Sequence, residues 1–144
     1  MVNPSKAKGT AAETAIVKYA QGLGFPFAER IPLHGNHDHG DIRLAPGLIL
    51  EVKAGKSAQR ASLGQVCRWM SEAMTEARNA HADAYGLIVQ REGIGLSRVG
   101  WWEAWLPDVN LPAAHKPTIT MPLIMVTLRD ALVYWRADGY GNPL

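Results

Sequence analysis

Asp41, Glu51 and Lys53 are the residues of this chain whose types and spacing point most directly to chemistry. They lie on two short apolar runs on either side of a turn-forming Pro-Gly dipeptide that begins at Pro46. A hairpin centred on Pro46 places Asp41 directly opposite Glu51, where Cβ atoms are about 5 Å apart and like charges repel. Two carboxylates at that distance form a chelate for a hard divalent cation, so the segment predicts a metal site with an ammonium beside it.

Alternation of side chains along the two runs supports this register. With residue 42 opposite 50 and residue 44 opposite 48, one hairpin face is apolar and the other carries the charged groups. A shift by one residue would mix the two faces. The alternative is an ordinary solvent-exposed face on which Lys53 partners the acids. The apolar face consists of Ile42, Leu44, Leu48, Leu50 and Val52.

Glu13 is a further candidate, because it points toward the apolar side of a helix predicted over residues 10–23. A carboxylate that faces a core is unfavourable without a partner. Glu13 therefore either reaches the Asp41–Glu51 site or is a first-turn glutamate that the helix dipole stabilises. The apolar stripe of this helix contains Ala12, Ile16, Tyr19, Ala20 and Leu23.

Basic residues are concentrated just after the predicted metal site. Between Val52 and Ser71 the chain has four Lys or Arg residues and no Asp or Glu. Such clusters bind phosphate groups, although ordinary surface lysines give the same pattern. The candidate phosphate contacts are Lys6, Lys8, Arg30, His39, Lys56, Arg60, Arg91 and Arg98.

His34, His37 and His39 fall within six residues of one another. Closely spaced histidines suggest zinc, but no cysteine accompanies them and the glycine-rich loop around them does not fix their geometry. The other interpretation is a loop at the mouth of the site that touches a substrate phosphate.

The composition is that of one folded domain over residues 1–144. Hydrophobic residues make up 47% and charged residues 19%, and the net charge is only +2. The single cysteine, Cys67, excludes an internal disulfide and is expected to be a buried thiol on a helix. The apolar runs are too short to span a membrane and the polar N-terminus lacks a signal-peptide core, so we expect a cytoplasmic protein.

The elements that must position these residues are predicted in the order helix, three strands, helix, strand. We expect an α/β or α+β domain with a mixed central sheet flanked by helices. Its core is expected at about residues 6–106, an extension at 107–138 and a loose tail at 139–144. Outside the hairpin, the predicted strands are 25–33 (with Phe27 and Ile31 inward), 84–90, 101–106 and 119–126, and the later helices begin at the capping residues Ser62 and Thr127.

Glu13, Asp41 and the triplet Glu51-Val52-Lys53 together resemble the PD-(D/E)xK nuclease superfamily, and the layout is most similar to small archaeal and phage Holliday-junction resolvases. The resemblance covers roughly residues 6–106, with Gly40 where the motif has proline. It implies a restriction-endonuclease-like core. It also implies a metal-dependent endonuclease that hydrolyses DNA phosphodiester bonds with Mg²⁺, for which Mn²⁺ can substitute.

By this resemblance, Asp41, Glu51 and the Val52 carbonyl bind the metal, and Glu13 completes its shell or holds a second cation. Lys53 orients or deprotonates the attacking water, or stabilises the phosphorane. The implied substrate is branched DNA such as a four-way junction, cut by a homodimer with twofold symmetry. The alternatives are another repair or nicking nuclease of the superfamily, a catalytically idle nucleic-acid-binding subunit, or an interaction protein that docks a partner on the tryptophan-rich strand 101–106.

Overall fold

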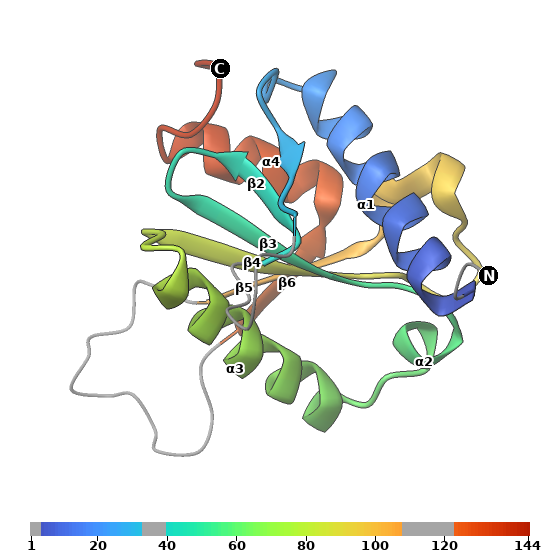
Figure 1. Ribbon diagram of the computed structural model, residues 1–144. Helices are drawn as coiled ribbons and strands as arrows, with labels where there is room; N and C mark the ends of the chain where they lie inside the picture. The colour runs from blue at the N-terminus through green and yellow to red at the C-terminus, as the bar shows by residue number, and fades with distance from the viewer. Residues whose placement is uncertain (1–3, 33–39, 108–122) are drawn as a thin grey trace.

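A six-stranded mixed sheet with helices on both faces organises the chain (Figure 1). The computed structural model describes residues 4–32, 40–107 and 123–144. The strands lie side by side in chain order, and only the third and fourth are parallel. The predicted mixed sheet flanked by helices is therefore confirmed, while the restriction-endonuclease-like core stays a prediction.

The sequence order of the elements matches the predicted one, with additions. The connector at 54–61 contains a short helix, and the glycine-rich loop at 91–100 contains most of a 3₁₀ helix. The elements are α1 (Pro4–Gln21), β1 (Glu29–Arg30), β2 (Ile42–Ala45), β3 (Leu48–Lys53), α2 (Lys56–Gln59), α3 (Leu63–Asn79), β4 (Ala84–Val89), the 3₁₀ helix η1 (Leu96–Trp101), β5 (Glu103–Pro107), β6 (Leu123–Thr127) and α4 (Leu128–Ala137).

Two helices begin at the predicted capping residues. The Ser62 hydroxyl accepts a hydrogen bond from the Gln65 amide at 3.1 Å, and Thr127 does the same for the Asp130 amide at 3.2 Å. Each hydroxyl satisfies an amide that the first helical turn leaves without a partner. Within the described parts of the chain, no helix is both long and apolar enough to cross a membrane.

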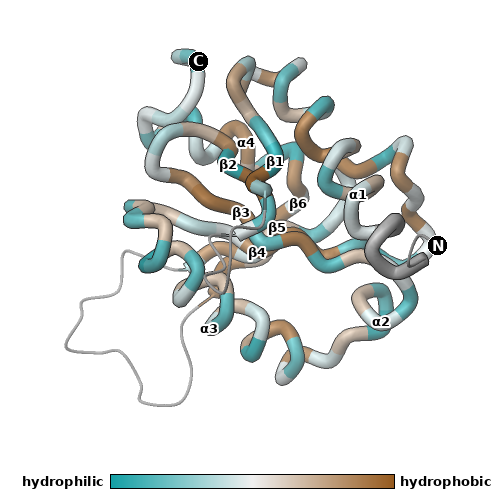
Figure 2. Tube along the Cα trace, viewed as in Figure 1, coloured by the Kyte–Doolittle hydropathy of each residue, from teal (hydrophilic) through white to brown (hydrophobic). Residues whose placement is uncertain are grey.

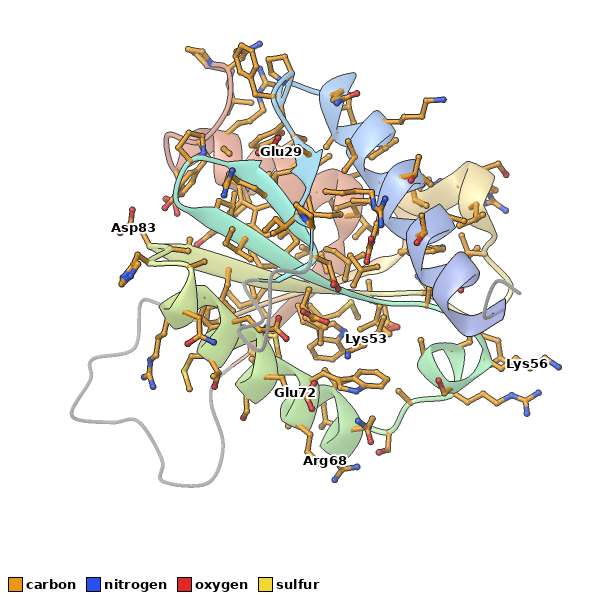
Figure 3. The ribbon with its side chains drawn as sticks, in the orientation of Figure 1. Glu29, Lys53, Lys56, Arg68, Glu72 and Asp83 are labelled. Carbon is orange, nitrogen blue, oxygen red and sulfur yellow. The ribbon has the colours of Figure 1, made fainter. Side chains whose placement is uncertain are left out.

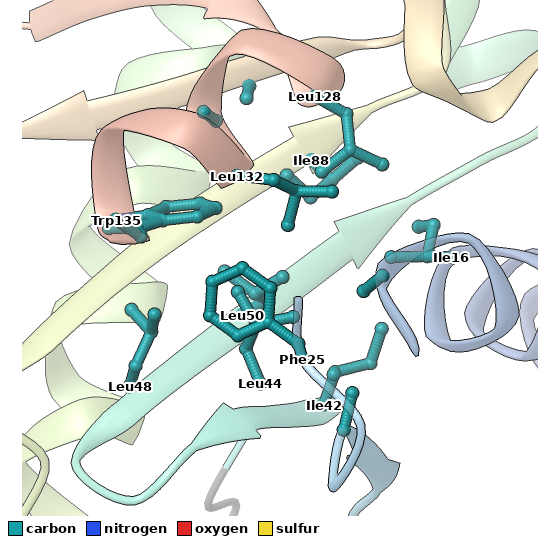
Figure 4. Packing of buried hydrophobic residues seen from close by; sticks show 14 of the residues in the cluster. Ile16, Phe25, Ile42, Leu44, Leu48, Leu50, Ile88, Leu128, Leu132 and Trp135 are labelled. Atoms are coloured by element: carbon teal, nitrogen blue, oxygen red, sulfur yellow. The ribbon is translucent and has the colours of Figure 1, made fainter. Parts of the chain in front are cut away.

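The larger hydrophobic core lies between the sheet and the pair α1 and α4. Figure 4 shows Trp135 and Leu132 of α4 facing Leu50 and Leu48 of β3. From α1, the positions 12, 16 and 20 of the predicted stripe are fully buried, whereas Leu23 at its end is partly exposed. The spacing of apolar residues therefore predicts correctly which side of α1 faces the sheet.

The second face of the sheet is covered by α3. Val66 and Met70 of this helix pack against Leu87 and Val89 of β4. Figure 2 shows the hydrophobic stretch along β3 that separates the two layers, and the alternating hydrophobic and hydrophilic turns of α3. Strand β5 contributes to both cores, with Ala104 and Leu106 in the larger core and Trp105 on the α3 side.

The hairpin of β2 and β3 has the predicted register at its open end. Ile42 pairs with Leu50, but Leu48 pairs with Ala45 rather than with Leu44. The turn has only two central residues, and Gly47 has φ +81, the value that the second of these positions requires in a type II turn. Type II turns do not match the twist of the strands that they join. The strand pairing is therefore irregular between residues 43 and 45, which accommodates this mismatch.

Two predictions near the chain ends need correction. The strand predicted over 25–33 is reduced to Glu29–Arg30, and Phe27 is 84% exposed, while Phe25 takes the buried position. The tail at 139–144 is held rather than loose, because the Asn142 amide donates to the Gly24 carbonyl at 2.7 Å. The last strand, predicted over 119–126, lies at an edge of the sheet, and its described part is Leu123–Thr127.

Candidate metal centre

Asp41 is placed at the open end of the hairpin by its backbone and its side chain. Its amide donates to the Leu50 carbonyl at 3.0 Å, and its carboxylate accepts a hydrogen bond from the Val52 amide at 2.8 Å. Gly40, just before it, has φ +95, and a Cβ atom there would collide with the side chain of Ile49. A proline cannot adopt that φ, which explains why glycine stands at this position.

Glu51 lies on β3 with its side chain on the α3 side of the sheet, and the residue is only 5% exposed. Burial and the neighbouring Glu51 charge raise the pKa of Asp41 to about 8. Burial, followed by contact with Glu76, raises the pKa of Glu51 to about 9. Asp41 and Glu51 are thus close enough for the Glu51 charge to oppose the ionisation of Asp41, as the hairpin register predicts.

Lys53 lies two residues further along β3, on the same face as Glu51. Its ammonium is 3.4 Å from Glu51 Oε1 and 3.7 Å from Glu72 Oε2, and it lies 5.6 Å from the centre of the Trp69 ring. Figure 3 shows Lys53 and Glu72 meeting between the sheet and α3. Burial lowers the pKa of Lys53, but the charges of Glu51 and Glu72 outweigh it and keep this pKa above its usual value. Lys53 is therefore an ammonium, suited to stabilising negative charge rather than to taking up a proton.

Glu13 is held by Arg30 rather than by the hairpin acids. The two side chains form an ion pair at 2.9 Å, and Arg30 also donates to the Thr10 hydroxyl at 3.4 Å. Glu13 still raises the pKa of Asp41, as the smallest of five influences. It therefore lies at the margin of the site, and Arg30, a predicted phosphate contact, is occupied by an acidic partner.

Glu76 is a buried acid of this site that sequence reasoning missed. It lies on α3, is 8% exposed, and raises the pKa of Glu51. Its position between Ala73 and Ala77, both buried on the apolar stripe of α3, is the signal that could have found it. The same argument identified Glu13.

The donor set fits a hard divalent cation. Glu51 Oε2 is buried and has no hydrogen-bond partner among the residues that the structure describes. Because the amide of Val52 points toward Asp41, its carbonyl faces the same edge of β3. No three His, Cys, Asp or Glu side chains in the described ranges surround one point as a complete ligand cage. Two carboxylates and a carbonyl leave room for water and phosphate ligands, which is how Mg²⁺ is usually bound.

Several predicted phosphate contacts gather where the parallel strands β3 and β4 end. Lys56 and Arg60 follow β3, Arg91 follows β4, and all three are exposed. The two loops are joined by hydrogen bonds from the Gly55 amide to Gln90 Oε1 at 2.8 Å and from the Gly93 amide to Gln59 Oε1 at 3.3 Å. These three basic residues therefore share one edge of the sheet, the edge toward which Lys53 lies.

The remaining predicted contacts are spread more widely. Arg98 is exposed on η1, which packs against α1 and α4 rather than α3. Lys6 and Lys8 belong to α1, but its described side chains begin at residue 9. The histidine loop with His34, His37 and His39 lies outside the described residues, so its zinc and phosphate interpretations both stay predictions.

Comparisons with protein-family models, with curated proteins and with solved structures gave no match to this chain.

Proposed function

We propose that this protein is a metal-dependent endonuclease that hydrolyses DNA phosphodiester bonds. The observation that carries the proposal is the convergence of Asp41 and Glu51, both with raised pKa, beside the Lys53 ammonium. Two buried acids with raised pKa values, together with a buried Glu51 oxygen that has no hydrogen-bond partner among the described residues, are costly to keep unless a cation compensates them. This supports a working metal site over a catalytically idle one.

Asp41 and Glu51 would hold the cation, Mg²⁺ or Mn²⁺, with the Val52 carbonyl as a further oxygen ligand. When bound, such an ion polarises the scissile phosphate and lowers the pKa of a water molecule next to it. The hydrogen bond from the Val52 amide fixes the orientation of Asp41 before any ligand arrives. The site is thus preorganised on two paired strands, which favours precise placement of a phosphate.

Lys53 would stabilise the negative charge that develops on the phosphate during attack. Its ammonium is already aligned by Glu51, Glu72 and the Trp69 ring, so little reorganisation is needed when the charge forms. Because its pKa is above the usual value, electrostatic stabilisation is the role that fits, rather than removal of a proton from water.

Lys56, Arg60 and Arg91 would contact the DNA backbone on either side of the scissile phosphate. They are exposed at the edge where β3 and β4 end, beyond Lys53. Contacts to phosphates position a substrate without reading its sequence. We therefore propose selection by DNA shape, with a four-way junction in the cytoplasm as the substrate and a twofold homodimer as the assembly that cuts two strands.

A single gel tests this function. Wild-type protein and the Asp41→Asn and Glu51→Gln variants are incubated with a labelled four-way junction or a matched linear duplex, with Mg²⁺ or with EDTA. We expect Mg²⁺-dependent cleavage by the wild type alone, with the junction preferred. Equal cleavage by either variant would refute the assignment, and cleavage of both substrates alike would favour a general nicking nuclease.

A further inference from the structure

We propose that β6 is the dimer interface of this protein, where it pairs antiparallel with β6 of a second copy of the chain about a twofold axis. This interface deepens the proposed function, on which the need for a twofold homodimer rests, by naming the surface that assembles. The features of the sheet edge that support it are independent of the metal site.

The two edges of the sheet differ in length and in charge. Among the described strands, β1 and β6 each have a neighbour on one side only. Strand β1 consists of Glu29 and Arg30, and both form ion pairs with nearby side chains. Short length and charge are features that keep an edge from pairing with another chain. Strand β6 (Leu123–Thr127) has neither, since it has five residues and none of them is charged.

Apolar side chains are partly exposed on both faces of β6. Ile124 pairs with Leu106 on the face of the larger core and is 37% exposed. Met125 pairs with Trp105 on the α3 face and is 51% exposed. A strand that is apolar on both faces is typical of the interior of a sheet, where neighbours cover it on each side. Strand β6 therefore has the composition of an inner strand at an outer position.

The backbone of β6 presents hydrogen-bonding groups on its outer side. The Leu128 amide donates to the Trp102 carbonyl at 2.9 Å, which continues the pairing of β6 with β5. Because bonded and non-bonded pairs alternate in an antiparallel ladder, the even-numbered residues of β6 direct their N–H and C=O groups to β5. The odd-numbered residues direct theirs away from β5, where no described strand lies. These residues are Leu123, Met125 and Thr127.

The outward groups are arranged symmetrically about Met125, so β6 is complementary to itself. In a twofold antiparallel pair, the register that uses all five residues places Met125 opposite the partner's Met125, and Leu123 opposite the partner's Thr127. Every outward N–H and C=O group then has a partner, and Ile124 meets the partner's Val126 on the other face. No like charges are opposed, because the strand has no charged residue. A second copy is therefore the occupant that matches this edge.

The same register aligns the two metal sites across one continuous sheet. Paired residues form a row that runs from Glu51 through Leu87 and Trp105 to Met125. In the dimer this row continues to the partner's Glu51, across three strand spacings in each copy and one at the interface. At about 4.8 Å per spacing, the two Glu51 residues lie about 34 Å apart. This distance is close to one turn of duplex DNA, which suits two cuts in one substrate.

Charges introduced at Met125 test the pairing. Met125→Lys and Met125→Glu each place like charges opposite one another at the twofold axis, so each alone should break the dimer. An equimolar mixture of the two variants places opposite charges there and should restore it. Phe27→Lys is the control, because Phe27 is 84% exposed two residues before β1, at the other edge of the sheet. Circular dichroism verifies that each variant is folded.

Sedimentation velocity of the full chain, in EDTA and without DNA, measures the assembly. We expect the wild type and Phe27→Lys to sediment at twice the chain mass of 15.7 kDa. Each Met125 variant alone should raise the dissociation constant of the dimer at least about tenfold, and the mixture should regain the dimer. A wild type that is monomeric at high micromolar concentration would overturn the inference. A dimer that persists in both Met125 variants, a mixture that stays monomeric, or equal dissociation of Phe27→Lys would also overturn it.

Failure of the proposed function gives a different result, because the sedimentation experiment contains neither metal nor DNA. If the dimer responds as expected but the wild type does not cleave DNA, the nuclease is refuted and the interface stands. If the wild type cleaves DNA but sediments as a monomer, the nuclease stands and the interface is refuted.

Discussion

The carboxylate of Asp41 accepts a hydrogen bond from the backbone amide of Val52 at 2.8 Å, across the open end of the hairpin. This contact does two things at once. It extends the pairing of β2 and β3 by one side chain, and it aims Asp41 at the strand that carries Glu51 and Lys53. The negative charge of Asp41 and its ability to accept a hydrogen bond can therefore be tested separately.

Asp41→Asn should keep the hairpin but lose the metal. An asparagine oxygen still accepts from the Val52 amide, whereas its neutral amide cannot replace a carboxylate ligand. Because the variant also removes a repelling acid beside Glu51, we expect metal-free protein at pH 8 to be at least as stable as the wild type. Asp41→Ala loses the hydrogen bond as well and should be less stable than Asp41→Asn by about 1 kcal/mol. Urea unfolding measures the stability of the variants, and Mn²⁺ titration measures their metal affinity. An Asp41→Ala protein as stable as Asp41→Asn would contradict the predicted contribution of the hydrogen bond.

The stability of the metal-free protein should fall as the pH rises. Burial and the charge of Glu51 raise the pKa of Asp41 from 3.8 to about 8, and burial and the neighbouring Glu76 raise the pKa of Glu51 from 4.5 to about 9, so the folded state holds protons that the unfolded state releases. This stabilisation is complete below the unfolded-state pKa values of 3.8 and 4.5. It is lost as the pH rises through the folded-state pKa values of about 8 and about 9. The slope is at most about 1.4 kcal/mol per pH unit for each such proton.

Divalent metal should reverse this trend. Mn²⁺ competes with protons for the same carboxylates, so it should raise the melting temperature strongly near pH 8 and little near pH 5. Thermal unfolding at both pH values, with EDTA or with Mn²⁺, provides the measurement. Equal stability of the metal-free protein at pH 5 and pH 8 would show that the two acids are not held as described.

The spacing of residues predicts that Asp41 and Glu51 lie together, because two simple rules determine the register of the hairpin. Alternation sorts the side chains of both strands onto two faces, and the Pro-Gly pair limits where the turn can lie. The irregularity before Ala45 escapes these rules, since it depends on how a type II turn fits the twist of two strands. It leaves the site unchanged because it lies at the closed end, away from Asp41.

Other features depend on contacts between distant segments and are beyond pattern reasoning. Phe25 and Phe27 are equally apolar, and only the turn after α1 decides that the first is buried and the second exposed. The tail after α4 reads as polar and glycine-rich, yet Asn142 pairs with the Gly24 turn. Glu76 could have been found, because an acid on the apolar stripe of α3 needs a buried partner.

Removal of the Lys53 ammonium should slow cleavage without loss of metal. We expect Lys53→Met to lower the cleavage rate about 10²–10³-fold, since it removes a preorganised positive charge. Mn²⁺ affinity should be unchanged or higher, because a cation that lies 3.4 Å from Glu51 no longer competes with the metal. Single-turnover cleavage and calorimetry separate the two effects. A loss of Mn²⁺ binding in Lys53→Met would contradict the assigned role.

Close packing between β4 and α4 should make Gly86 intolerant of a side chain. A Cβ atom there would lie 2.7 Å from Trp135 Cζ2 and 3.3 Å from Leu50 Cδ2. Gly86→Ala must displace a buried tryptophan, and we expect a loss of about 1–3 kcal/mol in the free energy of unfolding. Gly95→Ala is the control, because its Cβ position has no heavy atom within 4 Å from any described residue other than its chain neighbours. Urea unfolding of both variants tests the packing independently of any function.

The basic edge after β3 should contribute to DNA affinity through charge alone. Lys56 and Arg60 are exposed there, and each contact with a phosphate releases counterions when it forms. The double variant Lys56→Gln, Arg60→Gln should bind a four-way junction more weakly, and the slope of log affinity against log salt concentration should become shallower by about 2. Mn²⁺ affinity should not change, because Asp41 and Glu51 are untouched.

A charge-matched control makes this result specific to the edge. Arg129 is exposed on α4, which covers the opposite face of the sheet from α3. Arg129→Gln should leave both the affinity and the salt slope of junction binding at wild-type values. Fluorescence anisotropy at several salt concentrations, in Ca²⁺ or EDTA to prevent cleavage, gives both quantities. If Arg129→Gln weakens binding as much as the double variant does, DNA approaches through α4 and the basic edge has no part in binding.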